Sequence, residues 1–279
     1  MICAWTELLK VLPEWMRKDV DRLGRDTLQE LRLRLGKPPE LVSGMGRQIL
    51  HQAVTSDDLN FCINTASRYS PWASESVKQG YLTAAGGHRI GLCGQAVVHK
   101  GSVTGIRDLS SLCIRVARDY PGIARGLTGY KGSILIIGSP GSGKTTLLRD
   151  LIRQISNTRQ GSVGVIDERG ELFPKFSAFE TGAGTDILTG CCKSEGIDMI
   201  LRCMGPAIIA VDEITAERDS DALLRAGRCG VDLLATAHAS DRDDLRLRPV
   251  YEKLLNAQLF QWIVILQRDK SWTVERMVV

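Results

Sequence analysis

The sequence predicts an α/β protein in two parts: a doubly wound parallel-sheet domain over residues 131–279, preceded by a smaller α+β domain over residues 1–130. Three observations predict this. Beyond residue 130, strand-sized apolar runs alternate with helix-length segments, as in a parallel sheet. A glycine-rich loop follows the first of these runs, and the stretches before residue 130 alternate with the period of half-buried strands. A length of 279 residues suits two modest domains.

The front domain begins with a helical pattern. Residues 1–26 suit a short amphipathic helix that is broken or begun near Pro13. Leu31–Leu35 alternates leucine with arginine, so its leucines are expected to face a core. Ser56, followed by two aspartates, starts a helix that should end near Tyr69, because Pro71 follows.

The rest of the front domain reads as strands and turns. Gly80–Val98 is expected to form two strands around the Gly86-Gly87 hairpin, and Lys100-Gly101 is the next turn. Residues 112–117 alternate again, which indicates another strand. Glycines and Pro121 mark residues 119–132 as the hinge between the two domains.

The second domain has the pattern of a parallel sheet. Its expected helix after the glycine-rich loop is Thr146–Ile155. Five short apolar runs are expected to be its buried strands: Ser133–Ile137, Val163–Ile166, Ala207–Val211, Leu233–Ala237 and Trp262–Leu266.

Composition narrows the class of protein. No apolar run approaches the roughly 20 residues of a membrane-spanning helix, and the N-terminus lacks the pattern of a secretory signal. We therefore expect a cytoplasmic protein that can act as a peripheral protein at the inner face of a membrane. The eight cysteines have no metal-binding spacing and are expected to be reduced and mostly buried. The net charge is +4, and the excess lies in residues 1–130, with 17 Lys and Arg against 12 Asp and Glu. Such an excess can face nucleic acid, anionic lipid, a neighbouring subunit or solvent.

The stretch from Gly138 to Thr145 fits the phosphate-binding pattern G-x-x-x-x-G-K-[ST] and lies between an expected strand and an expected helix. Lys144 would reach the β- and γ-phosphates of a nucleotide, and the Thr145 hydroxyl would bind Mg²⁺. The expected contacts to ATP come from Gly138, Ser139, Pro140, Gly141, Ser142, Gly143, Lys144, Thr145 and Thr146.

Acids and a histidine follow three other expected strands. Ile208–Val211 runs into Asp212 and Glu213, a Walker B pattern in which Asp212 would hold Mg²⁺ and Glu213 would act as general base. Glu168 follows another strand and would help to hold the metal or to polarise the attacking water, although a surface turn explains this acid about as well. His238 ends a third strand, where it would sense the γ-phosphate or simply form a local hydrogen bond.

These segments, in this order, resemble the Walker A, Asp box, Walker B and His box of the type II/type IV secretion ATPases. The segments are Gly138–Thr145, Val165–Glu171, Met199–Pro206, Ile208–Glu213 and Thr236–Ala239. Within that superfamily, the front half is similar to a sporulation protein through Leu31–Pro38, Gly80–Thr83 and Gly87–Gly94.

The resemblance implies a RecA-like P-loop ATPase that uses ATP and Mg²⁺ and forms a homo-oligomer, a hexameric ring. It implies Glu168 as the Asp-box acid, Glu213 as the Walker B acid and His238 as the His-box residue. It also implies that front-domain arginines reach a nucleotide, and Arg89, Arg107 and Arg115 are the candidates, among which spacing does not choose. The partner would be the cytoplasmic face of a membrane channel or secretion complex active during endospore formation.

The alternative is an ATP-dependent nucleic-acid motor or a single-strand nucleic-acid-binding protein, since the front half is basic. Such proteins interleave aromatic with basic residues, and aromatic residues are only 5% of this chain, so we do not expect a nucleic-acid partner. A transporter ATPase lacks support because no L-S-G-G-Q-like signature lies between Glu168 and Asp212, and a small-molecule kinase would need an arginine-rich lid that is missing. The sequence does not separate ATP from GTP.

Overall fold

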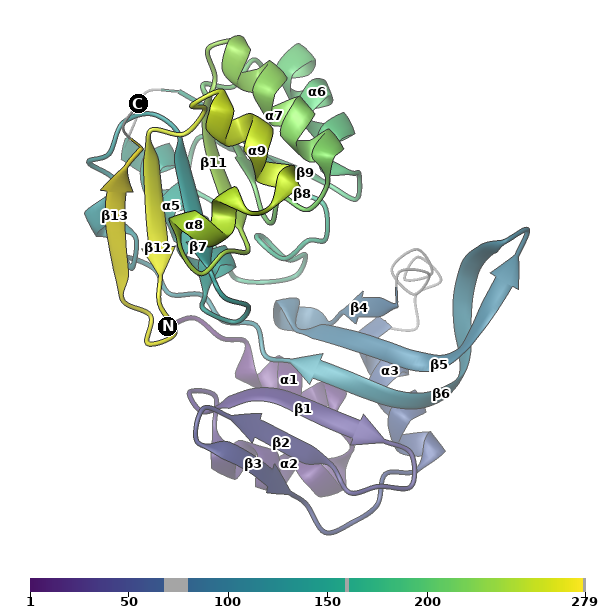
Figure 1. Ribbon diagram of the computed structural model, residues 1–279. Coiled ribbons are helices and arrows are strands. Elements are labelled where there is room, and N and C mark those ends of the chain that lie inside the picture. The colour runs from purple at the N-terminus through teal and green to yellow at the C-terminus, as the bar shows by residue number, and fades with distance from the viewer. Residues whose placement is uncertain (68–79, 159–160, 278–279) are drawn as a thin grey trace. The chain divides into compact units, whose positions relative to one another are not determined.

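The structure is a computed structural model that describes residues 1–67, 80–158 and 161–277 (Figure 1). The chain forms two compact units. Unit 1 comprises Met1–Asp119 together with Pro174–Phe179, and unit 2 comprises Tyr120–Phe173 and Glu180–Val279. Residues 120–130, which the sequence assigned to the front domain, therefore belong to unit 2, and a short segment from the second half of the sequence belongs to unit 1.

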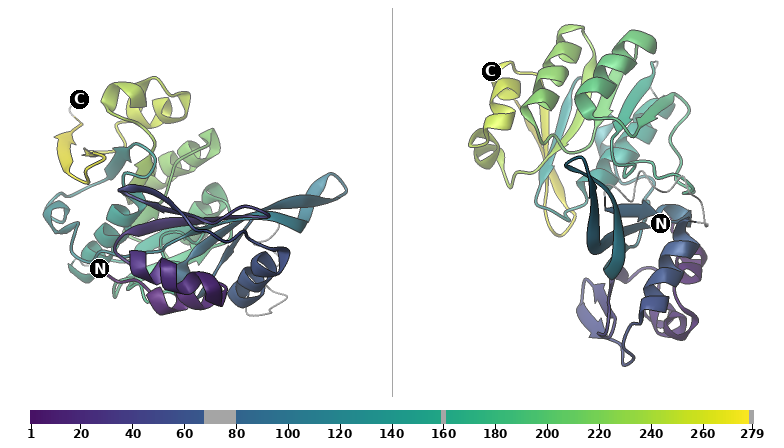
Figure 2. Two further views of the ribbon diagram at one scale, coloured as in Figure 1. Left: turned by 90° about the horizontal axis from the view of Figure 1, so that it is seen from below. Right: turned by 90° about the vertical axis from the view of Figure 1, so that its right-hand side faces the viewer.

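Unit 1 is built on an antiparallel sheet of six strands in the order β3-β2-β1-β6-β5-β4. The strands are β1 (Leu28–Arg34), β2 (Glu40–Ser43), β3 (Gly46–Ile49), β4 (Tyr81–Thr83), β5 (Arg89–His99) and β6 (Ser102–Arg115). The helices are α1 (Trp5–Val11), α2 (Glu14–Leu23), α3 (Ser56–Ser67) and the 3₁₀ turn η2 (Ala85–Gly87). Figure 2 shows α1, α2 and α3 together on one face of this sheet.

Alternation decides which face of the sheet the helices cover. Leu31 and Leu33 are fully buried, as are Leu112 and Ile114 opposite them on β6, and they form one core with the apolar faces of the helices. The intervening residues, among them Arg32, face away from this core. The expected pattern of leucine inside and arginine outside is confirmed for Leu31 and Leu33, but it is wrong for Leu35, which follows the end of β1 and is 48% exposed.

Unit 2 is built on a sheet of seven strands in the order β13-β12-β7-β11-β10-β8-β9, in which all neighbours are parallel except β12 and β13. The strands are β7 (Ile134–Gly138), β8 (Val163–Asp167), β9 (Thr185–Thr189), β10 (Ile208–Val211), β11 (Asp232–Ala237), β12 (Trp262–Leu266) and β13 (Trp272–Arg276). The helices are η3 (Arg125–Leu127), α5 (Lys144–Thr158), α6 (Lys193–Cys203), α7 (Glu217–Arg228), α8 (Arg242–Arg246) and α9 (Pro249–Asn256).

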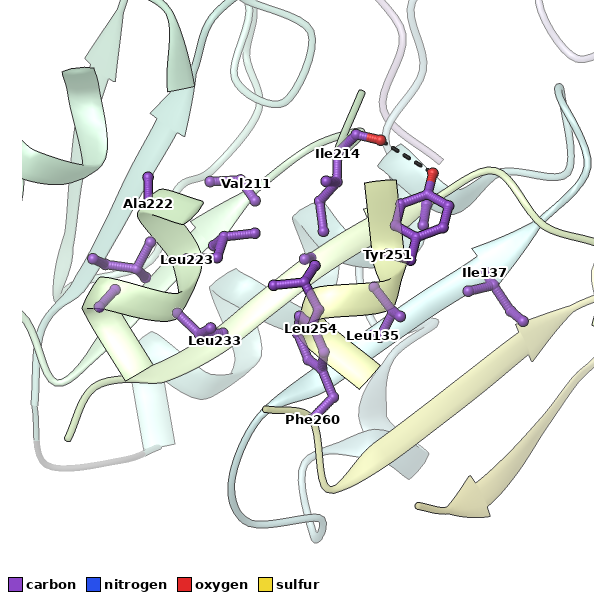
Figure 3. Close-up of a cluster of buried hydrophobic side chains, with 14 of the residues drawn as sticks. Leu135, Ile137, Val211, Ile214, Ala222, Leu223, Leu233, Tyr251, Leu254 and Phe260 are labelled. Atoms are coloured by element: carbon purple, nitrogen blue, oxygen red, sulfur yellow. Dashed lines mark hydrogen bonds between the residues drawn. The ribbon is translucent and has the colours of Figure 1, made fainter. Parts of the chain in front are cut away.

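Both faces of this sheet are buried, as expected for parallel strands. Along β7, Leu135 and Ile137 enter the core beneath α6, α7 and α9, whereas Ile134 and Ile136 enter a second core beneath α5. Figure 3 shows the first core, in which the hydroxyl of Tyr251 on α9 donates a hydrogen bond to the carbonyl of Ile214, 3.1 Å away. That bond fixes the loop that follows β10.

The predicted fold class, α/β with a parallel sheet, is confirmed, and all five expected core strands are present. Four strands were missed: β2, β3, β9 and β13. The first helical stretch is two helices separated at Pro13, and the end of α3 predicted near Tyr69 lies outside the described residues. The expectation that the cysteines are mostly buried is wrong, because only Cys62 is buried and Cys93, Cys203 and Cys229 are exposed; all eight are free thiols.

The expected hinge, residues 119–132, is held in unit 2 except for its first residue. The buried carboxylate of Asp150 on α5 accepts hydrogen bonds from the backbone N–H groups of Gly122 (3.0 Å) and Ala124 (2.7 Å). Leu127 packs into the core beneath α5. In the part of the chain that the structure describes, no helix is long and apolar enough to cross a bilayer.

Candidate nucleotide site

The loop from Gly138 to Thr145 connects β7 to α5 and has the backbone of a phosphate cradle. Gly141 and Gly143 have φ of 76° and 106°, a region that favours glycine. Gly138 is required for a different reason, because a Cβ there would lie 2.6 Å from the carbonyl oxygen of Leu266. The hydroxyl of Ser142 is buried and has no hydrogen-bond partner among the described residues. A phosphate at the N-terminus of α5 would find both backbone donors and this unpaired hydroxyl.

Lys144 begins α5 and is only 6% exposed. Its Nζ donates to the carbonyl oxygens of Gly138 (2.8 Å) and Ser139 (3.1 Å), both in the loop itself. Burial lowers the pKa of the ammonium, and the negative charges of Asp212 and Glu213 act in the opposite sense. The geometry therefore holds a cation inside the loop, where phosphate oxygens would replace the carbonyls as its partners.

Thr145 and Asp212 come together at the same edge of the sheet. The Thr145 hydroxyl donates to Asp212 Oδ2 at 2.7 Å, and the Thr236 hydroxyl donates to Asp212 Oδ1 at 2.5 Å. Thr236 also accepts the backbone N–H of Glu213 at 2.7 Å. A single threonine on β11 thus orients both acids that follow β10.

His238 connects Lys144 to Glu213. Its Nδ1 lies 2.9 Å from Lys144 Nζ, and its Nε2 lies 3.2 Å from Glu213 Oε1. Because an ammonium group only donates, Nδ1 must accept, which assigns the ring proton to Nε2 and makes that nitrogen the donor to Glu213. The P-loop lysine, the histidine and the glutamate form one hydrogen-bonded chain.

Glu213 occupies a strained backbone position. Its φ of 56° lies in the left-handed region, which costs a residue with a Cβ about 1 kcal/mol or more. Its second carboxylate oxygen lies 3.6 Å from the Arg169 guanidinium, so its carboxylate lies between a histidine and an arginine. The side chain is about one-third exposed, which leaves room for a water molecule to reach it.

Glu168 has different surroundings, although it lines the same small pocket as Asp212 and Glu213. Its carboxylate pairs with Nζ of Lys193, a residue of α6 that is 4% exposed, at 2.5 Å. The preceding Asp167 is buried and accepts the backbone N–H groups of Glu171 and Phe173, both at 2.8 Å. Burial raises the pKa of Asp167.

The residues fit a nucleotide-bound Mg²⁺ ion. A threonine hydroxyl beside an aspartate carboxylate offers hard oxygen ligands, and Mg²⁺ in nucleotide sites takes its other ligands from phosphates and water. The described residues contain no cluster of three or more Asp, Glu, His or Cys side chains that would hold a metal ion on its own. Thr145 and Asp212 are therefore suited to an ion that arrives with its nucleotide.

The three candidate arginines lie in unit 1. Arg89 and Arg115 are register partners on β5 and β6. The guanidinium of Arg89 lies 4.0 Å from the ring centre of Tyr81, and Arg115 Nε lies 3.6 Å from Glu30. Arg107 lies further along the same β5–β6 ribbon.

Arg107 is paired in register with Gln95, to whose side-chain oxygen its Nε donates at 3.1 Å. The structure thus brings Arg89 and Arg115 together and separates Arg107 from them.

Several residues at this edge of the sheet received no role from the sequence. Arg169 and Lys193 contact the two glutamates, Thr236 orients Asp212 and Glu213, and Lys270 contacts the phosphate-binding loop. Thr236 had a detectable signal, since it lies near the end of a strand, two residues before His238. The others reach the site from a turn, a helix and a hairpin, which spacing in the sequence does not connect.

The fold resembles that of P-loop secretion ATPases. Two solved structures have this fold: the ATPase DotB of Legionella pneumophila and the pilus retraction motor PilT with bound ADP. DotB matches with a TM-score of 0.59 and 18% identity, over 95% of this chain and 80% of that one. PilT matches with a TM-score of 0.58 and 17% identity, over 89% and 76% of the two chains.

The chain belongs to the family "Sporulation stage III, protein AA", whose model matches residues 5–276. It is 36% identical to the stage III sporulation protein AA of Bacillus subtilis over 95% of this chain and 92% of that protein. It is also 27% identical to the protein SEEDLING PLASTID DEVELOPMENT 1 of Arabidopsis thaliana, over 88% of this chain and 35% of that protein.

Proposed function

We propose that the protein is a Mg²⁺-dependent ATPase of the secretion-ATPase type. The observation that carries the proposal is the hydrogen-bonded chain from the phosphate loop through Lys144 and His238 to Glu213. It joins the group expected on the phosphates to the group expected on the attacking water. The ADP bound in the PilT structure supports a nucleotide as the ligand.

In this mechanism the loop amides and Lys144 bind the phosphates, and Thr145 and Asp212 would hold a Mg²⁺ ion, which would neutralise phosphate charge. Glu213 accepts the proton of the attacking water, a role worth about 10²–10⁴ in rate. The hydrogen bond from His238 Nε2 orients the Glu213 carboxylate, and phosphates bound at Lys144 would change the partners of His238. Glu168, paired with Lys193, has a supporting role at the same pocket.

The name of the Bacillus subtilis relative supports a role in sporulation. We propose further that the protein forms a hexameric ring that energises a channel or secretion complex during endospore formation, from the cytoplasmic side of a membrane. In such a ring Arg89, Arg107 or Arg115 would reach a nucleotide and supply charge to the transition state, an effect that can reach about 10³–10⁵ in rate. These arginines lie in the front domain whether the boundary is placed after residue 130, as the sequence predicts, or after residue 119, where unit 1 ends its first segment.

Equilibrium binding of ATP and ADP to the wild type and to Lys144→Ala tests the nucleotide site. We expect Lys144→Ala to abolish binding or weaken it severely, because the phosphates lose their fixed counter-charge. Lys131→Ala is the matched control, since Lys131 is exposed and its side chain makes no hydrogen bond or ion pair with a described residue. Equal binding by Lys144→Ala and wild type would rule out the site.

Light-scattering mass with and without ATP tests the ring, which predicts particles of six 30.6 kDa chains. ATP hydrolysis measured with and without single-stranded DNA tests the alternative of a nucleic-acid motor. A hydrolysis rate per chain that rises with protein concentration and does not change when DNA is added would support the ring. Strong stimulation by DNA, weakened by salt, would support the motor.

A further inference from the structure

Lys270 reaches the phosphate-binding loop from the far end of unit 2's sequence. It lies in the turn between β12 and β13, and its Nζ donates to the carbonyl oxygens of Gly141 (2.7 Å) and Ser142 (3.0 Å). These carbonyls belong to two consecutive peptide groups of the loop. A second ammonium group, besides Lys144, is therefore bonded to this loop from outside the P-loop pattern.

The contact fixes the direction of a loop amide. The Ser142 carbonyl belongs to the same peptide group as the N–H of Gly143, and in a trans peptide these two groups point in opposite directions. Holding the carbonyl on the Lys270 side directs the Gly143 N–H to the other side. Amide groups that converge on one side are what an anion-binding loop needs, so the contact preorganises the cradle.

Lys270 occupies a strained backbone position in this turn. The turn is closed by hydrogen bonds from Gln267 N to Ser271 O (2.9 Å) and from Lys270 N to Gln267 O (3.1 Å), and Asp269 caps Ser271. Lys270 has φ of 74°, a left-handed conformation in which glycine or asparagine is favoured. Turn formation alone would favour glycine or asparagine here, so the lysine side chain points to a function beyond the turn.

We infer that Lys270 is a positioning residue of the nucleotide site, which holds the Gly141–Gly143 backbone in its phosphate-binding form and adds a positive charge to that loop. This inference rests on the proposed function. It also distinguishes the loop of this chain from a bare P-loop pattern, since the C-terminal β12–β13 hairpin becomes part of the site. Binding of polyphosphate is the property it should affect.

The test compares Lys270→Met and Lys270→Gly with wild type in Mg²⁺–ADP affinity and in melting temperature without nucleotide. Both variants lose the two charged hydrogen bonds, so we expect ADP affinity to fall by about tenfold in each. Glycine relieves the left-handed strain and methionine does not, so the melting temperature of Lys270→Gly should equal or exceed that of Lys270→Met. Arg268→Met is the control, because it removes a positive charge from the same turn and the Arg268 side chain bonds to no described residue. This variant should bind ADP like wild type.

Lys270→Arg keeps a charged donor and should recover most of the affinity. Wild-type ADP affinity in both Lys270→Met and Lys270→Gly would overturn the inference, and so would an equal loss in Arg268→Met, which would reduce the effect to overall charge. If Lys270→Gly loses both affinity and melting temperature, Lys270→Arg decides: recovery supports positioning, and no recovery overturns it. Failure of the proposed function looks different, because then wild type and Lys144→Ala would both fail to bind ADP.

Discussion

Two neighbouring strands of the parallel sheet, β8 and β10, run into the same dipeptide, Asp-Glu, yet their acids have different surroundings. β8 and β10 are paired so that Ile166 lies opposite Val211, which brings Asp167-Glu168 beside Asp212-Glu213. At the end of β8, Asp167 accepts hydrogen bonds from backbone N–H groups, and Glu168 pairs with a buried lysine. The acids at the end of β10 contact the phosphate loop and His238 instead.

The difference shows what sequence pattern leaves undetermined. An apolar strand running into Asp-Glu predicts acids at the ligand edge of a sheet, and both pairs lie there. The adjoining strands differ: β10 lies next to β11, which carries Thr236 and is followed by His238, whereas β8 lies between β10 and β9. We therefore expect changes at Glu168 to affect stability and changes at Glu213 to affect turnover.

The largest expected stability effect follows from Glu168→Gln. The substitution leaves the ammonium of Lys193, whose side chain is 5% exposed, without its charged partner, and we expect the free energy of unfolding to fall by about 2–3 kcal/mol. This is less than for a fully buried pair because Glu168 is 33% exposed. Glu213→Gln should change stability by only about 0.5 kcal/mol. Urea unfolding of both variants checks this, and equal losses would remove the distinction between the two strand ends.

A smaller effect is expected for Thr236→Val, which keeps the shape of the side chain. It removes the hydrogen bond to Asp212 and the acceptor for the Glu213 N–H, which we expect to cost about 1–2 kcal/mol of stability and to slow hydrolysis. Thr158→Val is the control, because the exposed Thr158 bonds, among the described residues, only to carbonyls of its own helix. Unchanged hydrolysis in Thr236→Val would mean that the threonine does not position the acids.

The smallest effect concerns pH and Asp167→Asn. Burial raises the pKa of Asp167 in the folded state above its ordinary 3.8. At pH values between the ordinary pKa and the raised one, the folded state therefore binds more protons than the unfolded state. The contribution of Asp167 to wild-type stability should therefore fall as pH rises through that window, whereas an asparagine at this position does not titrate. The variant loses one of two backbone hydrogen bonds, about 1 kcal/mol at low pH. Its deficit should shrink as pH rises, and a deficit that grows would contradict the raised pKa.

The sequence predicted the parallel sheet and brought together most residues of the candidate nucleotide site because their signals are local. Continuous apolar runs mark strands buried on both faces, and the P-loop residues are consecutive. β9 and β13 were missed because they are edge strands with mostly partly exposed residues, which weakens the apolar signal. Arg169, Lys193 and Lys270 were missed because each contacts a residue that lies 25 to 129 positions away in the sequence.

The most direct test of the central claim is single-turnover hydrolysis of ATP with Mg²⁺ by Glu213→Gln and Glu168→Gln, with ATP binding measured on the same samples. If Glu213 is the general base, Glu213→Gln binds ATP like wild type and hydrolyses it about 10²–10⁴ times more slowly, since an amide does not accept the proton of water. Glu168→Gln, assayed where it is folded, should show a smaller loss. Bound but unhydrolysed ATP in Glu168→Gln, together with normal turnover in Glu213→Gln, would mean that the two acids have been assigned the wrong way round.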